Sequence, residues 1–242
     1  MPDDRRFDRG VVELERPDSR RWMPPSARDG AIGQRASLWR DSVWRGVAVE
    51  RGDGRPVLLV AEPEAGRRGL RDMASWLRRT GWAPLHAPVN RHAPQDARAL
   101  ARVERALRDV YRERRQRVVV VSHGWAGRMA KVAAVRYGDH VAGLCAIGVP
   151  IQTRLSADEL AATRQGPSTR RASERFLADV RQPVPEDIPY TIVYSRSDPS
   201  VGEHACEDRD PEPIEVFSDA HGLATDPETF RAVADLLTRV RS

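Results

Sequence analysis

The sequence has few cysteines, few aromatic residues and no long apolar run. Its two cysteines, Cys145 and Cys206, cannot form a disulfide framework in a chain of 242 residues, and this usage is typical of a reducing compartment. No apolar run approaches the roughly 18 residues that a membrane helix needs, and the N-terminus lacks the apolar core of a secretion signal. An aromatic content of 6% argues against an aromatic-lined binding protein. We therefore expect a cytoplasmic protein without a membrane span.

Lysine is almost absent, because Lys131 is the single lysine among 40 basic residues. The basic residues are opposed by 35 acids, which gives a net charge of +5 and a pI of about 9.8. A nucleic-acid surface would gather the arginines on one element, interleaved with aromatic residues or glycine. Here they scatter among the acids, as Arg102 and Arg105 do beside Glu104, which is typical of a solvated surface. We expect no nucleic-acid partner.

The length of the chain allows one full-sized domain. Residues 1–35 are rich in Arg, Asp and Pro without sustained periodicity, so we expect a disordered basic N-terminal extension. Residues 36–242 then form the folded domain. A short helix is expected over residues 37–45, with Leu38 and Trp39 on the same apolar face as Val43.

From residue 55 onward, apolar runs alternate with amphipathic stretches. Strands are expected at residues 56–61, 82–88, 118–121, 141–148, 190–194 and 214–217, and helices at 69–80, 97–117, 127–137, 172–181 and 226–241. The polar, proline-flanked residues 151–188 are expected to form a small cap. Alternation of this kind predicts an α/β fold with a mostly parallel sheet covered by helices on both faces, in three layers.

The most informative segment is VVVVSHGWAG, residues 118–127. A buried strand passes directly into a helix through small residues, with Gly124 at the centre and Ser122 and Ala126 on either side. A strand that turns so sharply into a helix crowds the residues next to the turn, which must therefore be small. The pattern predicts a tight turn whose apex is Gly124.

Residues 55–240 contain four recognisable segments, in the order PVLLVAEPEAG, SHGWAGRMAKVAAVRYGDHVAGLCAIGVP, YSRSD and DAHGLATDPETFRAVADLL. The first resembles a core strand with its oxyanion loop, and the second a nucleophile elbow with the helix and strand that follow. The third resembles the strand end that carries a catalytic acid, and the fourth a histidine loop with the last helix. In that order they resemble the esterase/lipase-like branch of the α/β-hydrolase family.

The resemblance implies a nucleophile, an acid and a histidine in that order along the chain. The serine position falls on Gly124, which has no side chain to attack a carbonyl carbon, whereas the acid position falls on Asp198. The histidine position falls on Ala220, with His221 as its neighbour, when the loop is aligned on the glycine and proline that follow. The resemblance therefore predicts a degenerate catalytic triad.

The same alignment implies a pocket lined by Glu62 and Pro63 of the oxyanion loop and by His123 and Trp125 of the elbow. A carboxylate at Glu62 would repel a developing oxyanion. His123 either lines the pocket or occupies the place where the family usually has histidine. Trp125 either floors or plugs the pocket, or packs beneath the cap.

Residues 203–208 and His221 include residue types that bind metals, but their spacing matches no standard pair of zinc ligands. We expect no metal site and no cofactor.

These observations predict a pseudoenzyme that binds a small ligand or a protein partner without hydrolysing it. Two alternatives remain open. Asp198 with His221 could act as an acid/base pair in lyase, cyclase or isomerase chemistry. A shifted alignment with Ser122 as nucleophile would give a weak esterase, although that residue falls within the strand rather than at the turn.

Overall fold

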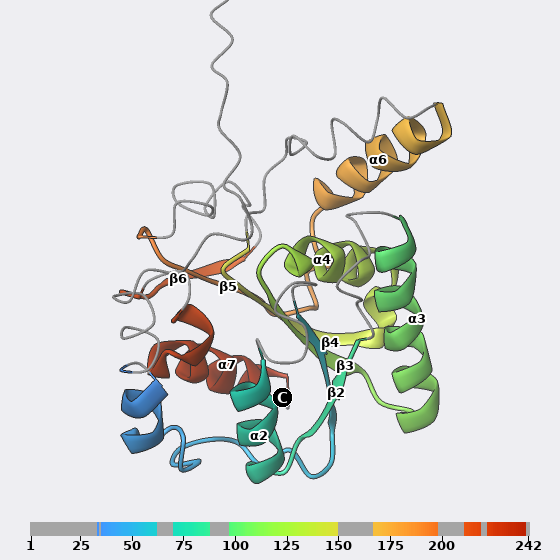
Figure 1. Ribbon diagram of the computed structural model, residues 1–242. Coiled ribbons are helices and arrows are strands. Elements are labelled where there is room, and N and C mark those ends of the chain that lie inside the picture. Colours follow the sequence, from blue (N-terminus) through green and yellow to red (C-terminus); the bar gives the residue numbers. More distant parts are fainter. Residues whose placement is uncertain are drawn as a thin grey trace, which may run out of the picture.

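The computed structural model describes residues 33, 35–61, 70–87, 97–149, 167–197, 211–218 and 222–240. One parallel sheet of six strands, in the order β2-β1-β3-β4-β5-β6, runs through this part of the molecule (Figure 1). The strands are β1 (Pro56–Val60), β2 (Ala83–His86), β3 (Val118–His123), β4 (Val141–Ile147), β5 (Tyr190–Tyr194) and β6 (Glu212–Glu215). The predicted parallel sheet is confirmed.

Helices cover both faces of the sheet, which gives the three expected layers (Figure 1). The helices are α2 (Arg71–Arg79), α3 (Ala97–Arg114), α4 (Ala126–Arg136), α6 (Pro167–Val180) and α7 (Pro227–Arg239), with short 3-10 turns η2 (Gly138–His140) and η4 (Leu223–Thr225). Helices α3 and α4 lie on one face, whereas α2 and α7 lie on the other. No helix among the described residues is both long and apolar enough to cross a membrane.

Alternation along the strands divides the core in two. In β1, Leu58 and Val60 belong to the cluster under α3 and α4, whereas Val57 and Leu59 belong to the cluster under α2 and α7. All five residues of β1 are buried, because helices cover both faces of a parallel sheet. This is why the strands read in the sequence as continuous apolar runs.

The segment before β1 packs on the α2 and α7 side of the sheet. Residues 35–40 are helical, and Leu38 and Val43 are buried, while the indole N–H of Trp76 donates to the Val43 carbonyl at 2.7 Å. The prediction for Trp39 was wrong, since half of this residue is exposed. In a helix of under two turns, Leu38 alone reaches the core, and Trp39 points outward beneath the Arg35 guanidinium.

Several element boundaries differ from the sequence prediction, among them the start of α6 and both ends of β6. Helix α6 begins at Pro167, five residues before the expected start at residue 172. The added turn is polar, so apolar periodicity gave no sign of it, although proline is well suited to the first turn of a helix. Strand β6 spans Glu212–Glu215 rather than residues 214–217, and Phe217 beyond it is 94% exposed.

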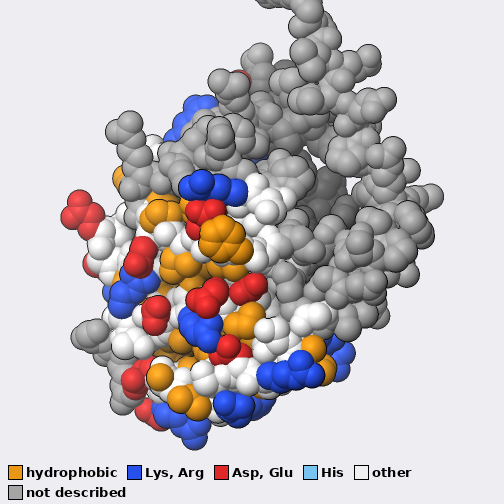
Figure 2. Space-filling view, turned by 90° about the vertical axis from the view of Figure 1, so that its left-hand side faces the viewer, with side chains coloured by type: hydrophobic (Ala, Val, Ile, Leu, Met, Phe, Trp, Pro, Cys, Tyr) orange, Lys and Arg blue, Asp and Glu red, His pale blue; other side chains and the backbone are white. Residues whose placement is uncertain are grey.

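Charged side chains of both signs are interspersed on the face of the molecule that Figure 2 shows, which lies on the left in Figure 1. Many arginines pair with nearby acids, as Arg35 does with Asp72 at 2.8 Å and Arg117 with Asp187 at 2.8 Å. This arrangement agrees with a solvated surface on the described part of that face.

Asp41 connects the N-terminal segment to α7. Its carboxylate accepts the backbone N–H of Val43 at 2.9 Å and two bonds from Arg231 at 2.7 and 2.8 Å. The Val43 N–H, together with Arg231, lowers the pKa of Asp41 below its ordinary value, although burial opposes the shift. A lowered pKa means that the stabilisation is present above the pKa of the unfolded chain and is lost as pH falls through the folded value.

We predict that Asp41→Asn, which keeps an acceptor for Val43 but loses the charge, lowers the free energy of unfolding by about 1 kcal/mol at neutral pH. The difference from wild type should be smaller at about pH 3, because this lies below the ordinary pKa of aspartate and the stabilisation decreases as pH falls toward the lowered folded-state pKa. Urea unfolding at both pH values measures it. Glu228→Gln is the matched control, because Glu228 pairs with the same arginine but is 60% exposed, and it should have a smaller effect. An equal loss at both pH values would contradict the ion-pair explanation.

Candidate functional site

The turn between β3 and α4 has the geometry that its sequence predicted. Strand β3 ends at His123, and α4 begins at Ala126. Between them, Gly124 has a φ of +64°, a conformation that glycine adopts without steric cost. The Gly124 N–H donates to the Ile147 carbonyl at 2.9 Å, and its own carbonyl accepts the Gly127 N–H at 3.0 Å. One residue thus ends the β3–β4 ladder and starts the helix.

Crowding beside this turn is severe at Gly127. A Cβ built on Gly127 would lie 2.2 Å from one methyl carbon of Val149 and 2.7 Å from the other. Ala126 is also completely buried. The sequence pattern predicted small residues at Ser122 and Ala126, but it did not single out Gly127, whose neighbour Val149 comes from the far end of the next strand.

Ser122 lies within the sheet rather than at the apex of the turn. It is fully buried, and its hydroxyl donates to the Cys145 carbonyl at 3.2 Å. Burial raises the pKa of the neighbouring Cys145 thiol to about 12, so this group stays protonated. Neither side chain is placed as an exposed nucleophile at the turn.

The described ends of the other strands converge on the same edge of the sheet as the turn. In the register, Val60 of β1 lies opposite Ser122 of β3, and Ile147 of β4 opposite Val193 of β5. The chain therefore leaves β1, β3 and β5 at one edge, which is where open α/β sheets bind ligands. Asp198, Glu62 and Pro63 follow these strand ends but lie outside the described residues.

A hydrogen bond joins the segments that lead to the predicted acid and histidine positions. The Ser195 hydroxyl, just after β5, donates to the Ser218 carbonyl, just after β6, and both residues are buried. Leu223 lies near Gly148, because a Cβ on Gly148 would be 3.2 Å from a Leu223 methyl carbon. The sequence contained no signal for the bond between the two serines.

The start of α7 is anchored next to the predicted histidine loop. Asp226 caps the helix by accepting the Glu228 N–H at 2.9 Å, and the Thr229 hydroxyl donates to the Leu223 carbonyl at 2.7 Å. Burial raises the pKa of Asp226 above its ordinary value, against the effect of the Glu228 N–H. Ala220 and His221 precede this anchored turn but lie outside the described residues, so their roles stay predictions.

The two remaining elbow residues are only partly buried. Trp125 packs against the core cluster under α3 and α4, and His123 ends β3. Their roles in a pocket stay predictions. The metal-type residues 203–208 also lie outside the described residues.

Helix α4 is buried along most of its length, including two basic side chains. Arg128 and Lys131 are 2% and 1% exposed, and the Arg128 guanidinium lies over the Phe176 ring of α6, 5.4 Å from its centroid. The helix after the turn is therefore held firmly on the side facing α6.

No protein-family model matches the chain, and no curated protein matches it. Solved structures do. A metagenome-derived lipolytic enzyme matches with a TM-score of 0.60 at 16% identity, over 80% of this chain and 96% of the enzyme. The monoacylglycerol lipase of Paleococcus ferrophilus matches with a TM-score of 0.59 at 12% identity, over 77% of this chain and 96% of the lipase.

A third match is an α/β-hydrolase from a lagoon-sediment metagenome, with a TM-score of 0.57 at 15% identity, over 80% of this chain and 94% of the enzyme. Identities this low establish the fold alone. The chain has the fold of the α/β-hydrolases, with lipases and esterases among its structural neighbours.

We predict that Gly127→Ala lowers the free energy of unfolding by about 1–3 kcal/mol through overpacking against Val149. Helix propensity alone predicts the opposite sign, a gain of roughly 1 kcal/mol. Chemical unfolding measures the change. In the double variant with Val149→Ala, the loss should be smaller than the sum of the single losses, because the clash has been removed. A stabilised Gly127→Ala, or strict additivity, would show that the close approach is not tight.

Proposed function

We propose that this chain is a non-hydrolytic protein of α/β-hydrolase fold that binds a small ligand at the carboxyl edge of its sheet. The observation that carries the proposal is Gly124 at the apex of the β3–α4 turn, with a φ of +64°. Active members of the fold place their serine on this strained turn. Gly124 supplies the backbone conformation but has no atom that can attack a carbonyl carbon.

The loss of a nucleophile removes most of the rate enhancement of a serine hydrolase. In a comparable enzyme its removal lowers turnover by a factor on the order of 10⁶. Ser122 offers no replacement, because its hydroxyl is buried and bonded to the Cys145 carbonyl. Ordinary ester hydrolysis is therefore not the function that we propose.

Binding is favoured by the same features. Strand ends converge at one edge, where ligands of open α/β sheets bind. A glycine at the apex also lets a ligand atom approach the main chain in the space that a serine side chain would otherwise occupy. Trp125 follows at once, is partly exposed and packs against the core cluster under α3 and α4, and we propose that it lines this space.

We predict that the purified protein will not hydrolyse p-nitrophenyl butyrate above background and will not be labelled by a fluorophosphonate. The unhydrolysed ester should raise the melting temperature of the protein, and Trp125→Ala should diminish that rise. Spectrophotometry, intact-mass analysis and thermal shift make the three measurements. Labelling at Ser122 would contradict the proposal, with Ser122→Ala as the control. Turnover without labelling would also contradict the proposal, because it would mean that a general base activates water without a covalent intermediate.

We predict that Gly124→Ser destabilises the fold by roughly 1–3 kcal/mol without creating an esterase, because a serine at this φ is strained and lacks a base at Ala220. Adding Ala220→His and then Glu62→Gly should restore measurable ester turnover stepwise. Gly54→Ser is the matched control for strain, because Gly54 has a φ of +78° and no atom within 4 Å of a built Cβ.

Thermal melting and ester turnover are measured across the single, double and triple variants. Two outcomes would contradict the proposal. An efficient esterase from Gly124→Ser alone would mean that His221 is a working base and that the histidine position does not fall on Ala220. A folded but inactive triple variant would mean that the binding surface lies elsewhere.

A further inference from the structure

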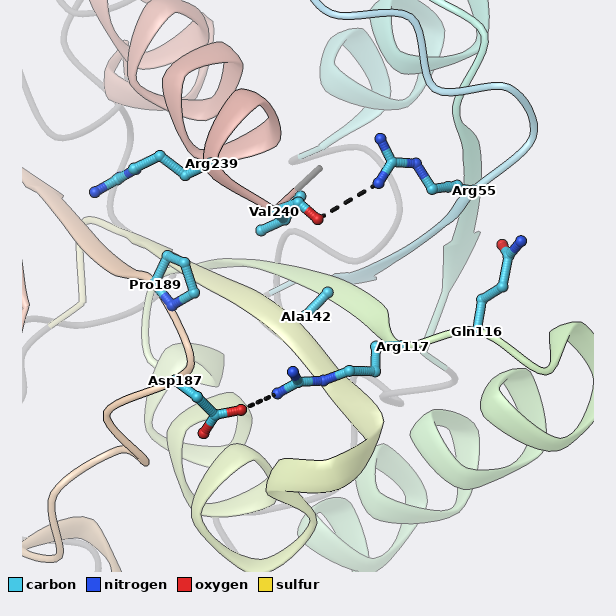
Figure 3. A pocket seen from close by; sticks show the side chains of 8 residues that line it. All are labelled: Arg55, Gln116, Arg117, Ala142, Asp187, Pro189, Arg239 and Val240. Carbon is cyan, nitrogen blue, oxygen red and sulfur yellow. Dashed lines mark hydrogen bonds and ion pairs between the residues drawn. The ribbon is translucent and has the colours of Figure 1, made fainter. Parts of the chain in front are cut away.

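A cavity of about 420 Å³ opens at the amino-terminal edge of the sheet, at the opposite end of the strands from the turn at Gly124 (Figure 3). The residues around it come from segments far apart in the sequence. Most of them precede β1, β3 or β5 or lie at the end of α7, and Ala142 lies near the start of β4. None of these residues belongs to the site proposed above.

Two arginines leave neighbouring strands at this edge with their guanidinium groups directed apart, Arg55 toward Val240 and Arg117 toward Asp187 (Figure 3). Arg55 directly precedes β1, and Arg117 directly precedes β3. The two strands pair in parallel with Val57 opposite Val119, so the arginines occupy equivalent positions on neighbouring strands. Neighbouring strands are about 4.8 Å apart, and like charges at opposed positions destabilise a sheet unless they are compensated.

Only one of the two arginines has a carboxylate partner among the described residues. Arg117 donates to Asp187 at 2.8 Å. Arg55 instead donates a long bond of 3.4 Å to the Val240 carbonyl and lies over the Trp82 ring, 4.8 Å from its centroid. The two arginines and Asp187 together carry one positive charge in excess.

A third arginine of the lining, Arg239, is directed elsewhere. Its guanidinium donates to Glu212 at 2.5 Å and to the Thr191 hydroxyl at 2.6 Å, and its side chain runs away from Arg55 (Figure 3). It therefore adds little to the charge that faces Arg55. The rest of the lining consists of the polar Gln116 and the apolar side chains of Ala142, Pro189 and Val240.

We propose that this cavity binds a small organic carboxylate. The carboxylate group bonds to the guanidinium group of Arg55, Arg117 adds positive charge at another part of the lining, and the apolar body of the ligand lies against Ala142, Pro189 and Val240. The excess of one positive charge matches a monoanion, and the planar guanidinium fork matches the planar carboxylate through paired N–H groups. Asp187 fixes Arg117 in position.

Isothermal titration of the full chain with benzoate and with benzamide tests the proposal, because the two probes share a ring and differ in charge. Benzoate is expected to bind at least tenfold more tightly. Arg55→Gln should raise the Kd for benzoate by about tenfold, since it removes a charge-assisted hydrogen bond, and Arg117→Gln should raise it by a smaller factor, since it removes only a more distant positive charge. Ala142→Leu should weaken binding of the ring while leaving the arginines unchanged.

The matched control is Arg112→Gln on α3, whose side chain is 68% exposed and lies outside the cavity lining. Unchanged benzoate affinity in this variant supports the site. Equal weakening in Arg112→Gln and Arg55→Gln would mean attraction to net charge only, and equal affinity for benzoate and benzamide would mean an apolar cavity. If benzoate binds only to a variant that ends at Val240, the cavity is occupied by residues 241 and 242 in the full chain. Each of these three results overturns the proposal.

Discussion

The backbone conformation at Gly124 determines what this molecule presents at the carboxyl edge of its sheet. A φ of +64° at this residue allows the Gly124 N–H to close the ladder to β4 while its carbonyl starts α4. Helix α4 then packs so closely that Gly127 contacts Val149. A larger residue at position 127 would clash with the Val149 side chain. The same close approach buries α4 almost completely, including Arg128 and Lys131. A substitution at this turn would therefore alter the packing of α4 and the geometry of any site beside it.

Much of this fold could be predicted from the sequence because its strands are buried on both faces. The run at residues 190–194 was predicted with both boundaries correct, since five apolar or β-favouring residues are bounded by proline and polar residues. Where a segment is buried on one side only, prediction was weaker. Trp39 was assigned to the core because a short helix gives too few residues to define its apolar face, and the polar first turn of α6 had no apolar periodicity at all.

The candidate site, like the fold, could be predicted from the sequence only in part. Gly124 could be located from sequence because a strand, a turn and a helix follow one another within ten residues. The bond between Ser195 and Ser218 could not, because it joins the ends of two strands whose pairing is set by the sheet. The pair Arg55 and Arg117 was invisible for the same reason. They are 62 positions apart along the chain (117 − 55), and only the register of β1 on β3 brings their backbone positions to neighbouring strands.

The two proposed sites rest on different physical features, so each can fail without the other. The elbow proposal depends on one dihedral angle and on a missing side chain at the carboxyl edge. The cavity at the amino edge depends on strand register and on how arginine charge is compensated. This chain satisfies its arginines in several ways, by carboxylates at Arg117 and Arg231 and by aromatic rings at Arg55 and Arg79. An aromatic face attracts a guanidinium group without using its N–H groups as a carboxylate would. Those N–H groups lie in the guanidinium plane and can bond to another acceptor. Arg55 is therefore better placed to receive an anion than an arginine that is paired with a carboxylate.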